Sequence, residues 1–161
     1  MDLATLNTAQ NADTGIEIEI FHPTTGEPIG LTIMVLGSDS QAYIDAERKI
    51  NKRRNEQAKR TRDLSAGLDY DQLQAAVTEK MVACFVNWKT ADGAPLKLNG
   101  TGLESSKDNF RKVITDRGFF WLRQQVQQAM DNVANFLPSS ASSSSPQPSS
   151  DLSTTDQTKT E

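Results

Sequence analysis

The segment over residues 16–54 constrains the fold of this chain more than any other part of it. Three isoleucines alternate with two glutamates over 16–20, so an extended strand there has one apolar face and one acidic face. A turn rich in Pro and Gly follows over 22–28, and an almost wholly apolar run then occupies 31–36. The segment therefore predicts an antiparallel hairpin, and its second half is expected to lead into a helix.

That helix is predicted over residues 39–62. Ser38 or Ser40 offers a hydroxyl to the first backbone amides, and Asp39 suits the positive end of the helix dipole. Its apolar positions are few, so only a narrow apolar stripe is expected to pack on the core. The second half of the helix is charged and is expected to extend into solvent. The apolar positions are Ala42, Tyr43, Ala46 and Ile50.

Apolar spacing predicts three further helices. The first covers residues 69–88, where apolar side chains recur at steps of three and four: Leu73, Val77, Met81, Cys84, Phe85 and Trp88. After a break, residues 96–98 predict a short extended piece. The next helix starts at Ser105 or Ser106 and carries Phe110, Val113 and Ile114, and Gly118 marks a bend. The last covers 119–137, with an apolar face backed by a glutamine-rich one.

These elements predict an α+β fold that is mostly α, with a two-stranded antiparallel hairpin packed against about four helices. Residues 1–15 are polar and are expected to form a flexible arm, and residues 16–137 a single domain. Residues 138–161 are Ser-rich with almost no large apolar side chain, so a disordered tail is expected there. No run is long enough to span a bilayer, and the N-terminus is not expected to be a signal peptide. A cytoplasmic location follows from this interpretation.

The residue types that carry catalysis are scarce. His22 is the single histidine and lies in the predicted turn, where a surface position is expected. Cys84 is the single cysteine and falls on an apolar helix face, where it is expected to pack as a small hydrophobe. The paired Glu17 and Glu19 lack the aromatic surroundings of a glycosidase cleft, and no glycine-rich phosphate loop occurs. We therefore predict no enzyme activity, no cofactor and no metal site.

A basic run occupies the second half of the helix predicted over 39–62. It contains eight Lys or Arg residues: Arg48, Lys49, Lys52, Arg53, Arg54, Lys59, Arg60 and Arg62. Such a run suits nucleic-acid phosphates, an acidic protein partner, or a solvated helix end that complements its own dipole. The chain as a whole is acidic, and no aromatic side chains interleave with these cations. The pattern favours the structural or protein-partner interpretation over nucleic acid.

Several stretches together resemble a known family. The strand over 16–20 is followed by His-Pro-Thr-Thr-Gly-Glu-Pro-Ile-Gly, and then by Leu-Thr-Ile-Met-Val-Leu-Gly-Ser-Asp-Ser and the basic helix. Val-Asn-Trp at 86–88 and Phe-Phe-Trp at 119–121 also fit. Over residues 16–137 the chain resembles the tail assembly chaperones of long-tailed bacteriophages and prophages, which are encoded upstream of the tape-measure protein. The similarity lies in turn residues and a helix start, and includes no catalytic motif.

This resemblance implies a non-enzymatic protein that binds the tape-measure protein, helps recruit tail-tube subunits, acts in the host cytoplasm and is absent from the mature virion. We accordingly identify two candidate partner surfaces. One is basic, with Arg48, Lys49, Lys52, Arg53 and Arg54, and the other lies on the glutamine-rich helix, with Gln124 and Gln128. Homo-oligomerisation stays open. The alternatives are a structural protein of the virion tail or capsid and a small nucleic-acid-binding regulator that uses the helix at 48–62.

Overall fold

The computed structural model describes residues 6–61 and 69–137, and confirms an α+β fold that is mostly helical. The predicted Ser-rich tail over 138–161, Arg62 and residues 1–5 lie outside the described residues. In chain order the elements are α1 Ala9–Thr14, β1 Ile16–Phe21, β2 Pro28–Val35, α2 Gln41–Thr61, α3 Tyr70–Cys84, β3 Phe85–Thr90, β4 Leu96–Leu98, β5 Thr101–Leu103, α4 Lys107–Thr115, the 3-10 turn η2 Arg117–Phe119, α5 Phe120–Asp131 and the 3-10 turn η3 Val133–Phe136.

The predicted hairpin is confirmed. β1 and β2 pair antiparallel with Ile18 opposite Ile33 and Ile20 opposite Leu31, so the isoleucines of β1 share one face with the apolar side chains of β2. Ile20 and Ile33 are buried, whereas Glu17 and Glu19 point to the other, exposed face. The alternation of the sequence therefore fixes which face of the sheet meets the core.

The sheet is larger than the predicted hairpin, and the extended piece predicted over 96–98 is confirmed as β4. β3 pairs antiparallel with β2 and makes a three-stranded sheet in the order β1-β2-β3, and a separate small hairpin joins β4 to β5. The helix predicted over 69–88 ends at Cys84, and the chain enters β3 directly. The register of β2 and β3 shifts between Met34 and Val35, which leaves Val86 as an extra residue in β3. Because of this extra residue, Phe85 and Trp88 both face the core although they are three positions apart, a spacing that is typical of a helix.

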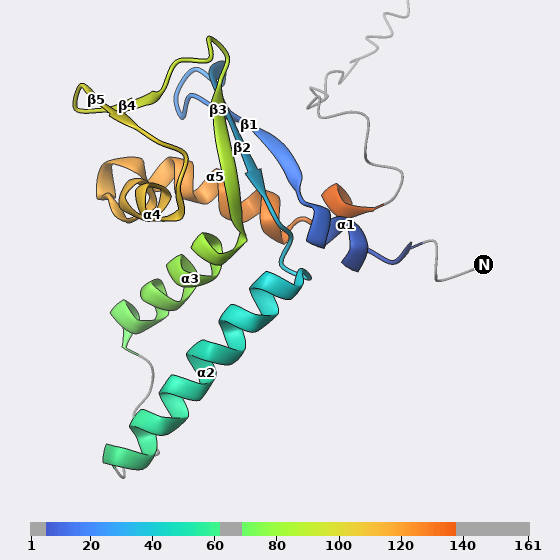
Figure 1. Cartoon of the computed structure of the whole chain (residues 1–161), viewed down its shortest axis with the longest axis vertical. Helices are drawn as coiled ribbons and strands as arrows, with labels where there is room; N and C mark the ends of the chain where they lie inside the picture. Colours follow the sequence, from blue (N-terminus) through green and yellow to red (C-terminus); the bar gives the residue numbers. More distant parts are fainter. Residues whose placement is uncertain (1–5, 62–68, 138–161) are drawn as a thin grey trace, which may run out of the picture.

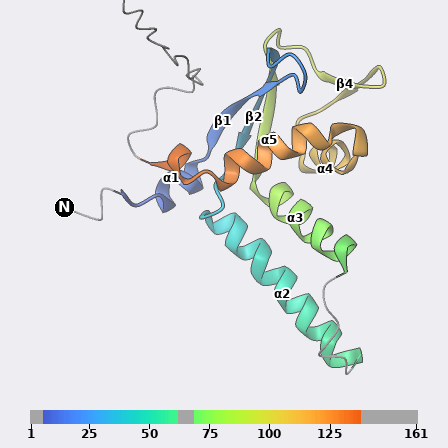
Figure 2. The same cartoon turned by 180° about the vertical axis from the view of Figure 1, so that it is seen from behind.

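Helix α5 covers the apolar face of the sheet, as Figures 1 and 2 show from opposite sides. Its buried side chains are Leu122, Val126 and Met130. α4 closes one end of this layer through Phe110, which stacks on Phe85 with ring centroids 4.3 Å apart. The predicted cap Ser106 begins α4 and accepts a hydrogen bond from the amide of Asn109 at 3.2 Å.

Helices α2 and α3 project together away from the sheet (Figure 1). Among the described elements only α3 packs extensively against α2. Ala46 and Ile50 are the buried apolar side chains of α2, and Ser40 is fully buried at its start. Ser40, one of the two predicted caps, precedes α2, and its hydroxyl accepts a hydrogen bond from the amide of Tyr43 at 3.3 Å.

The two ends of the domain differ from the predictions. Residues 1–5 of the predicted flexible arm over 1–15 lie outside the described residues, but within the rest of it the structure places α1 over Ala9–Thr14, and Ala12 is fully buried. The helix predicted over 119–137 is divided into η2, α5 and η3. Gly37 contacts both α1 and η3. Its amide donates to the Ala12 carbonyl at 3.0 Å, and its Cα faces the ring of Phe136.

Candidate functional site

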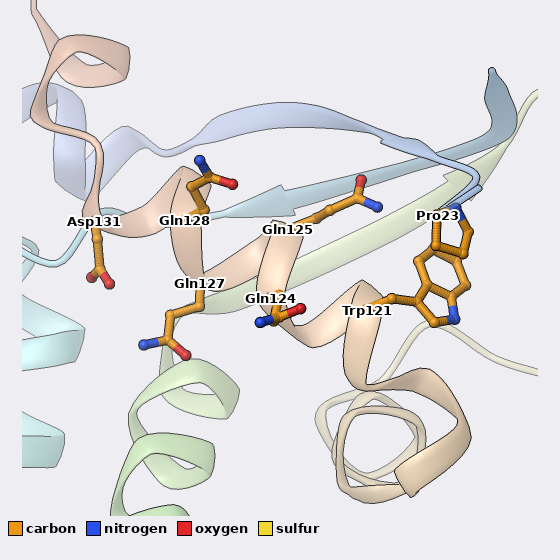
Figure 3. Close-up of a pocket in the computed structure, with 7 residues that line it drawn as sticks. All are labelled: Pro23, Trp121, Gln124, Gln125, Gln127, Gln128 and Asp131. Carbon is orange, nitrogen blue, oxygen red and sulfur yellow. The ribbon is translucent and has the colours of Figure 1, made fainter. Parts of the chain in front are cut away.

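An open hollow of about 560 Å³ runs along the exposed flank of α5. Figure 3 shows Trp121 and Pro23 at one end of it and Asp131 at the other. The wall between them consists of carboxamide side chains: Gln124, Gln125, Gln127 and Gln128. A carboxamide both donates and accepts hydrogen bonds, so this surface can pair with the polar groups of a peptide without requiring a charge.

Gln125 also forms hydrogen bonds with the backbone at the edge of the sheet. Its side-chain oxygen accepts from the backbone N–H of Phe21 at 3.0 Å, and its side-chain nitrogen donates to the carbonyl of Phe21 at 2.8 Å. A neighbouring strand makes the same pair of bonds to one residue of an antiparallel partner. The side chain is half-buried, so these bonds also fix α5 against the end of β1.

Both predicted glutamines, Gln124 and Gln128, line this hollow and are exposed. The other five lining residues were not predicted as members of the site: Pro23, Trp121, Gln125, Gln127 and Asp131. The helical spacing of Trp121, Gln125 and Gln128 places them on one side of α5, so Trp121 and Gln125 could have been found from spacing alone. The approach of Pro23 depends on a pairing between residues about a hundred positions apart and has no local signal.

The basic run is placed on α2, which carries seven Lys or Arg and three Asp or Glu. Arg48, Lys52 and Lys59 recur at a spacing that puts them opposite the buried Ala46 and Ile50. Within the described part of the chain, Lys49 and Lys52 make no side-chain ion pair. This exposed basic side of α2 is the part of the predicted surface that a partner can reach.

Two of the predicted basic residues form ion pairs within the domain. Arg53 forms an ion pair with Glu79 of α3, and Arg48 forms one with Asp45 at 3.4 Å. Arg54 is nearby and donates to the side-chain oxygen of Asn51 at 3.5 Å. Arg53 therefore serves the packing of α2 on α3, which the sequence analysis did not foresee.

A second contact between the same helices involves Lys80. Its ammonium lies 4.7 Å from the ring centre of Tyr43 and 3.6 Å from a carboxylate oxygen of Glu47. Partial burial works to lower the pKa of Lys80, but Tyr43 and Glu47 outweigh that effect, and the pKa is raised. Lys80 is thus held in its charged form between the two helices.

Cys84 and His22 occupy the environments predicted for them. Cys84 is fully buried, and desolvation raises the pKa of its thiol despite the contact with the Ser40 hydroxyl at 3.8 Å. His22 is exposed in the turn, where its Nδ1 accepts from the amides of Thr24 and Thr25, both at 3.3 Å. Among the described residues there is no group of three or more His, Cys, Asp or Glu that could hold a metal ion.

The predicted surfaces are separate. The basic side belongs to α2 and the carboxamide hollow to α5, and these two helices do not pack extensively against each other. No described helix is long and apolar enough to cross a membrane. Comparisons with protein-family models, with curated proteins and with solved structures found no match to this chain.

Proposed function

We propose that this protein is a non-enzymatic tail assembly chaperone of a long-tailed bacteriophage or prophage. In this role it binds the tape-measure protein in the host cytoplasm, helps recruit tail-tube subunits and leaves before the virion is complete. The family resemblance over residues 16–137 supplies the identity of these partners. The carboxamide hollow on α5 is the observation that carries the binding role.

The hollow supports this role because it is open and lined by uncharged carboxamide side chains along most of its length, with Asp131 at one end. Carboxamides adapt to either a donor or an acceptor, which suits a protein that holds a long partner at many similar positions. The basic side of α2 offers a second contact that steers an acidic segment toward the domain. The carboxamide hollow lies on α5, which packs on the sheet, and the basic side lies on α2, which packs on α3.

The test is a pull-down of the separately expressed tape-measure protein and tail-tube protein by the full chain. The first variant combines Gln124→Ala with Gln128→Ala, two exposed positions whose removal leaves the core intact. Exposed polar substitutions usually change stability by less than about 0.5 kcal/mol. We expect binding of the tape-measure protein to fall at least about tenfold, which corresponds to about 1.4 kcal/mol.

A second variant reverses three charges on the exposed side of α2: Arg48→Glu, Lys52→Glu and Lys59→Glu. Arg53 is left unchanged, because a glutamate there would face Glu79 and disturb the packing of α3. The matched control reverses three exposed charges on other elements: Lys97→Glu, Arg111→Glu and Arg117→Glu. We expect only the α2 variant to slow association, and this difference should shrink as salt rises.

The outcomes separate the alternatives. If both variants bind the tape-measure protein as the unchanged chain does, these surfaces are not its binding sites. A stoichiometric amount of this protein in purified virions would instead identify a structural subunit. A salt-dependent shift of DNA or RNA that disappears with the α2 variant would identify a nucleic-acid-binding regulator.

A further inference from the structure

The outer edge of β1 is an incompletely paired edge of the sheet. β1 has β2 on one side only, and the backbone groups of Phe21 face away from β2, since they bond to Gln125. Backbone direction alternates along a strand, so the N–H and C=O groups of Glu19 and Glu17 also face outward. Among the described residues outside the strands, no backbone or side-chain group bonds to them.

At each edge of the sheet, one side chain forms a hydrogen bond with the outward-facing backbone of one residue. On the opposite edge the Ser105 hydroxyl accepts from the amide of Trp88 at 2.9 Å. On the β1 edge the Gln125 carboxamide both accepts from and donates to Phe21, as one peptide unit of an added strand does. Gln125 thus occupies the first position of a strand site and leaves the next two outward-facing residues unpaired.

We propose that the β1 edge binds an extended, lysine- or arginine-containing segment of a partner protein as a fourth strand of the sheet. The segment displaces the Gln125 carboxamide from Phe21 and bonds to the backbone groups of Glu19 and Glu17. Displaced from the edge, the Gln125 side chain stays among the carboxamides of the hollow. Backbone pairing supplies the affinity, and side-chain charge selects the sequence.

Charge complementarity identifies the occupant as basic. Glu17 and Glu19 lie on the exposed face of β1. The Nζ of Lys89, which belongs to β3 at the opposite edge of the sheet, already donates to Glu17 at 2.6 Å. Glu19 has no ion pair among the described residues. A cation on a neighbouring strand pairs favourably with such a carboxylate, whereas like charges directly opposite are unfavourable. For the same reason antiparallel pairing with the β1 edge of a second copy is disfavoured.

The experiment uses the full chain and a synthetic peptide of about seven residues that alternates Lys with Thr or Val, a length typical of strands. Amide hydrogen exchange is followed by NMR while the peptide is added. We expect the amides of Glu17 and Glu19 to exchange freely in the protein alone and at least about tenfold more slowly with the peptide bound. A peptide with Glu in place of Lys should bind at least about tenfold more weakly, and one with Pro at alternate positions should not bind.

Three variants sharpen the test. Gln125→Ala should bind the lysine peptide several-fold more tightly, since no carboxamide has to be displaced, while Gln72→Ala, which removes an exposed carboxamide of α3 outside the hollow, should bind as the unchanged chain does. Glu19→Lys should invert the preference from the lysine to the glutamate peptide. If Gln125→Ala does not fold, the Glu19→Lys variant decides alone, because that position is exposed.

Several results would overturn the proposal. They are no binding of the lysine peptide, equal binding of the proline peptide, and binding that leaves the amides of Glu17 and Glu19 unprotected. Protection that grows with protein concentration in the absence of peptide would assign the edge to a second copy instead. None of these results depends on the tape-measure protein, so failure here leaves the chaperone role to be judged by its own pull-down.

Discussion

The ring of Phe110 joins α4 to the sheet, and its removal should be the most destabilising single change among those considered. The side chain is fully buried, lies 12° from parallel to Phe85 and also approaches Trp88, with ring centres 6.4 Å apart. Phe110→Ala removes the whole buried ring and leaves a cavity between a helix and a strand. Substitutions of this kind cost about 3–5 kcal/mol.

The matched control is Phe120→Ala, one residue inside α5 with 53% of the residue exposed. It should cost less than about 1 kcal/mol, since most of that ring remains in water in the folded state. For a domain of this size each kcal/mol lowers the melting temperature by roughly 4 °C, so a loss of about 3–5 kcal/mol in Phe110→Ala should lower it by roughly 12–20 °C. Urea unfolding followed by circular dichroism gives the free energies directly.

A double-mutant cycle with Phe85→Ala then isolates the stacking of the two rings. We expect a coupling energy of about 0.5–1.5 kcal/mol, because a close offset-stacked pair contributes that much beyond burial. Equal losses from Phe110→Ala and Phe120→Ala would refute the placement of α4 on the sheet. A cost below about 1 kcal/mol for Phe110→Ala would refute it as well.

Three further changes test other parts of the structure. Gly37→Ala should lower stability by about 1–3 kcal/mol in urea unfolding, because the new methyl would lie 2.9 Å from the Cβ of Ala12 and 3.0 Å from the ring of Phe136. Ser106→Ala should cost about 1 kcal/mol in the same assay, since it removes the N-cap bond of α4. Burial raises the pKa of Cys84, so the unfolded thiol ionises first as the pH rises. Stability should therefore fall above about pH 8.5, and the urea midpoint of Cys84→Ala should change less over that range.

The sequence predicted most of the fold because its apolar spacing was regular where the elements are regular. The hairpin, α2 and α4 lie close to their predicted positions, and Ser106 caps α4 as its hydroxyl suggested. The boundary between α3 and β3 was missed because an extra residue, Val86, spaces the inward-facing Phe85 and Trp88 three apart. That spacing imitates a helix, although the β-branched and aromatic composition of Phe85–Thr90 is typical of a strand.

The candidate sites were predicted in part. Exposure of Gln124, Gln128 and Lys52 followed from amphipathic spacing, which separates a polar face from an apolar one. The bonds between Gln125 and Phe21 and the ion pair between Arg53 and Glu79 were not foreseen. Each joins residues from elements that only the tertiary fold brings together, and one sequence contains no signal for such pairs.

The attachment of α2 has a consequence for how the molecule opens. Among the described elements, extensive packing reaches α2 through α3 alone, and each of the ion pairs of Arg53 and Lys80 that reinforce it includes one side chain that is more than half exposed. A segment with so few buried contacts unfolds locally at a smaller free energy than the whole domain. The far half of α2 should therefore unfold and refold many times while the sheet and α5 stay intact. Its Lys and Arg side chains then reach partners at a greater distance from the domain than they would on a rigid helix.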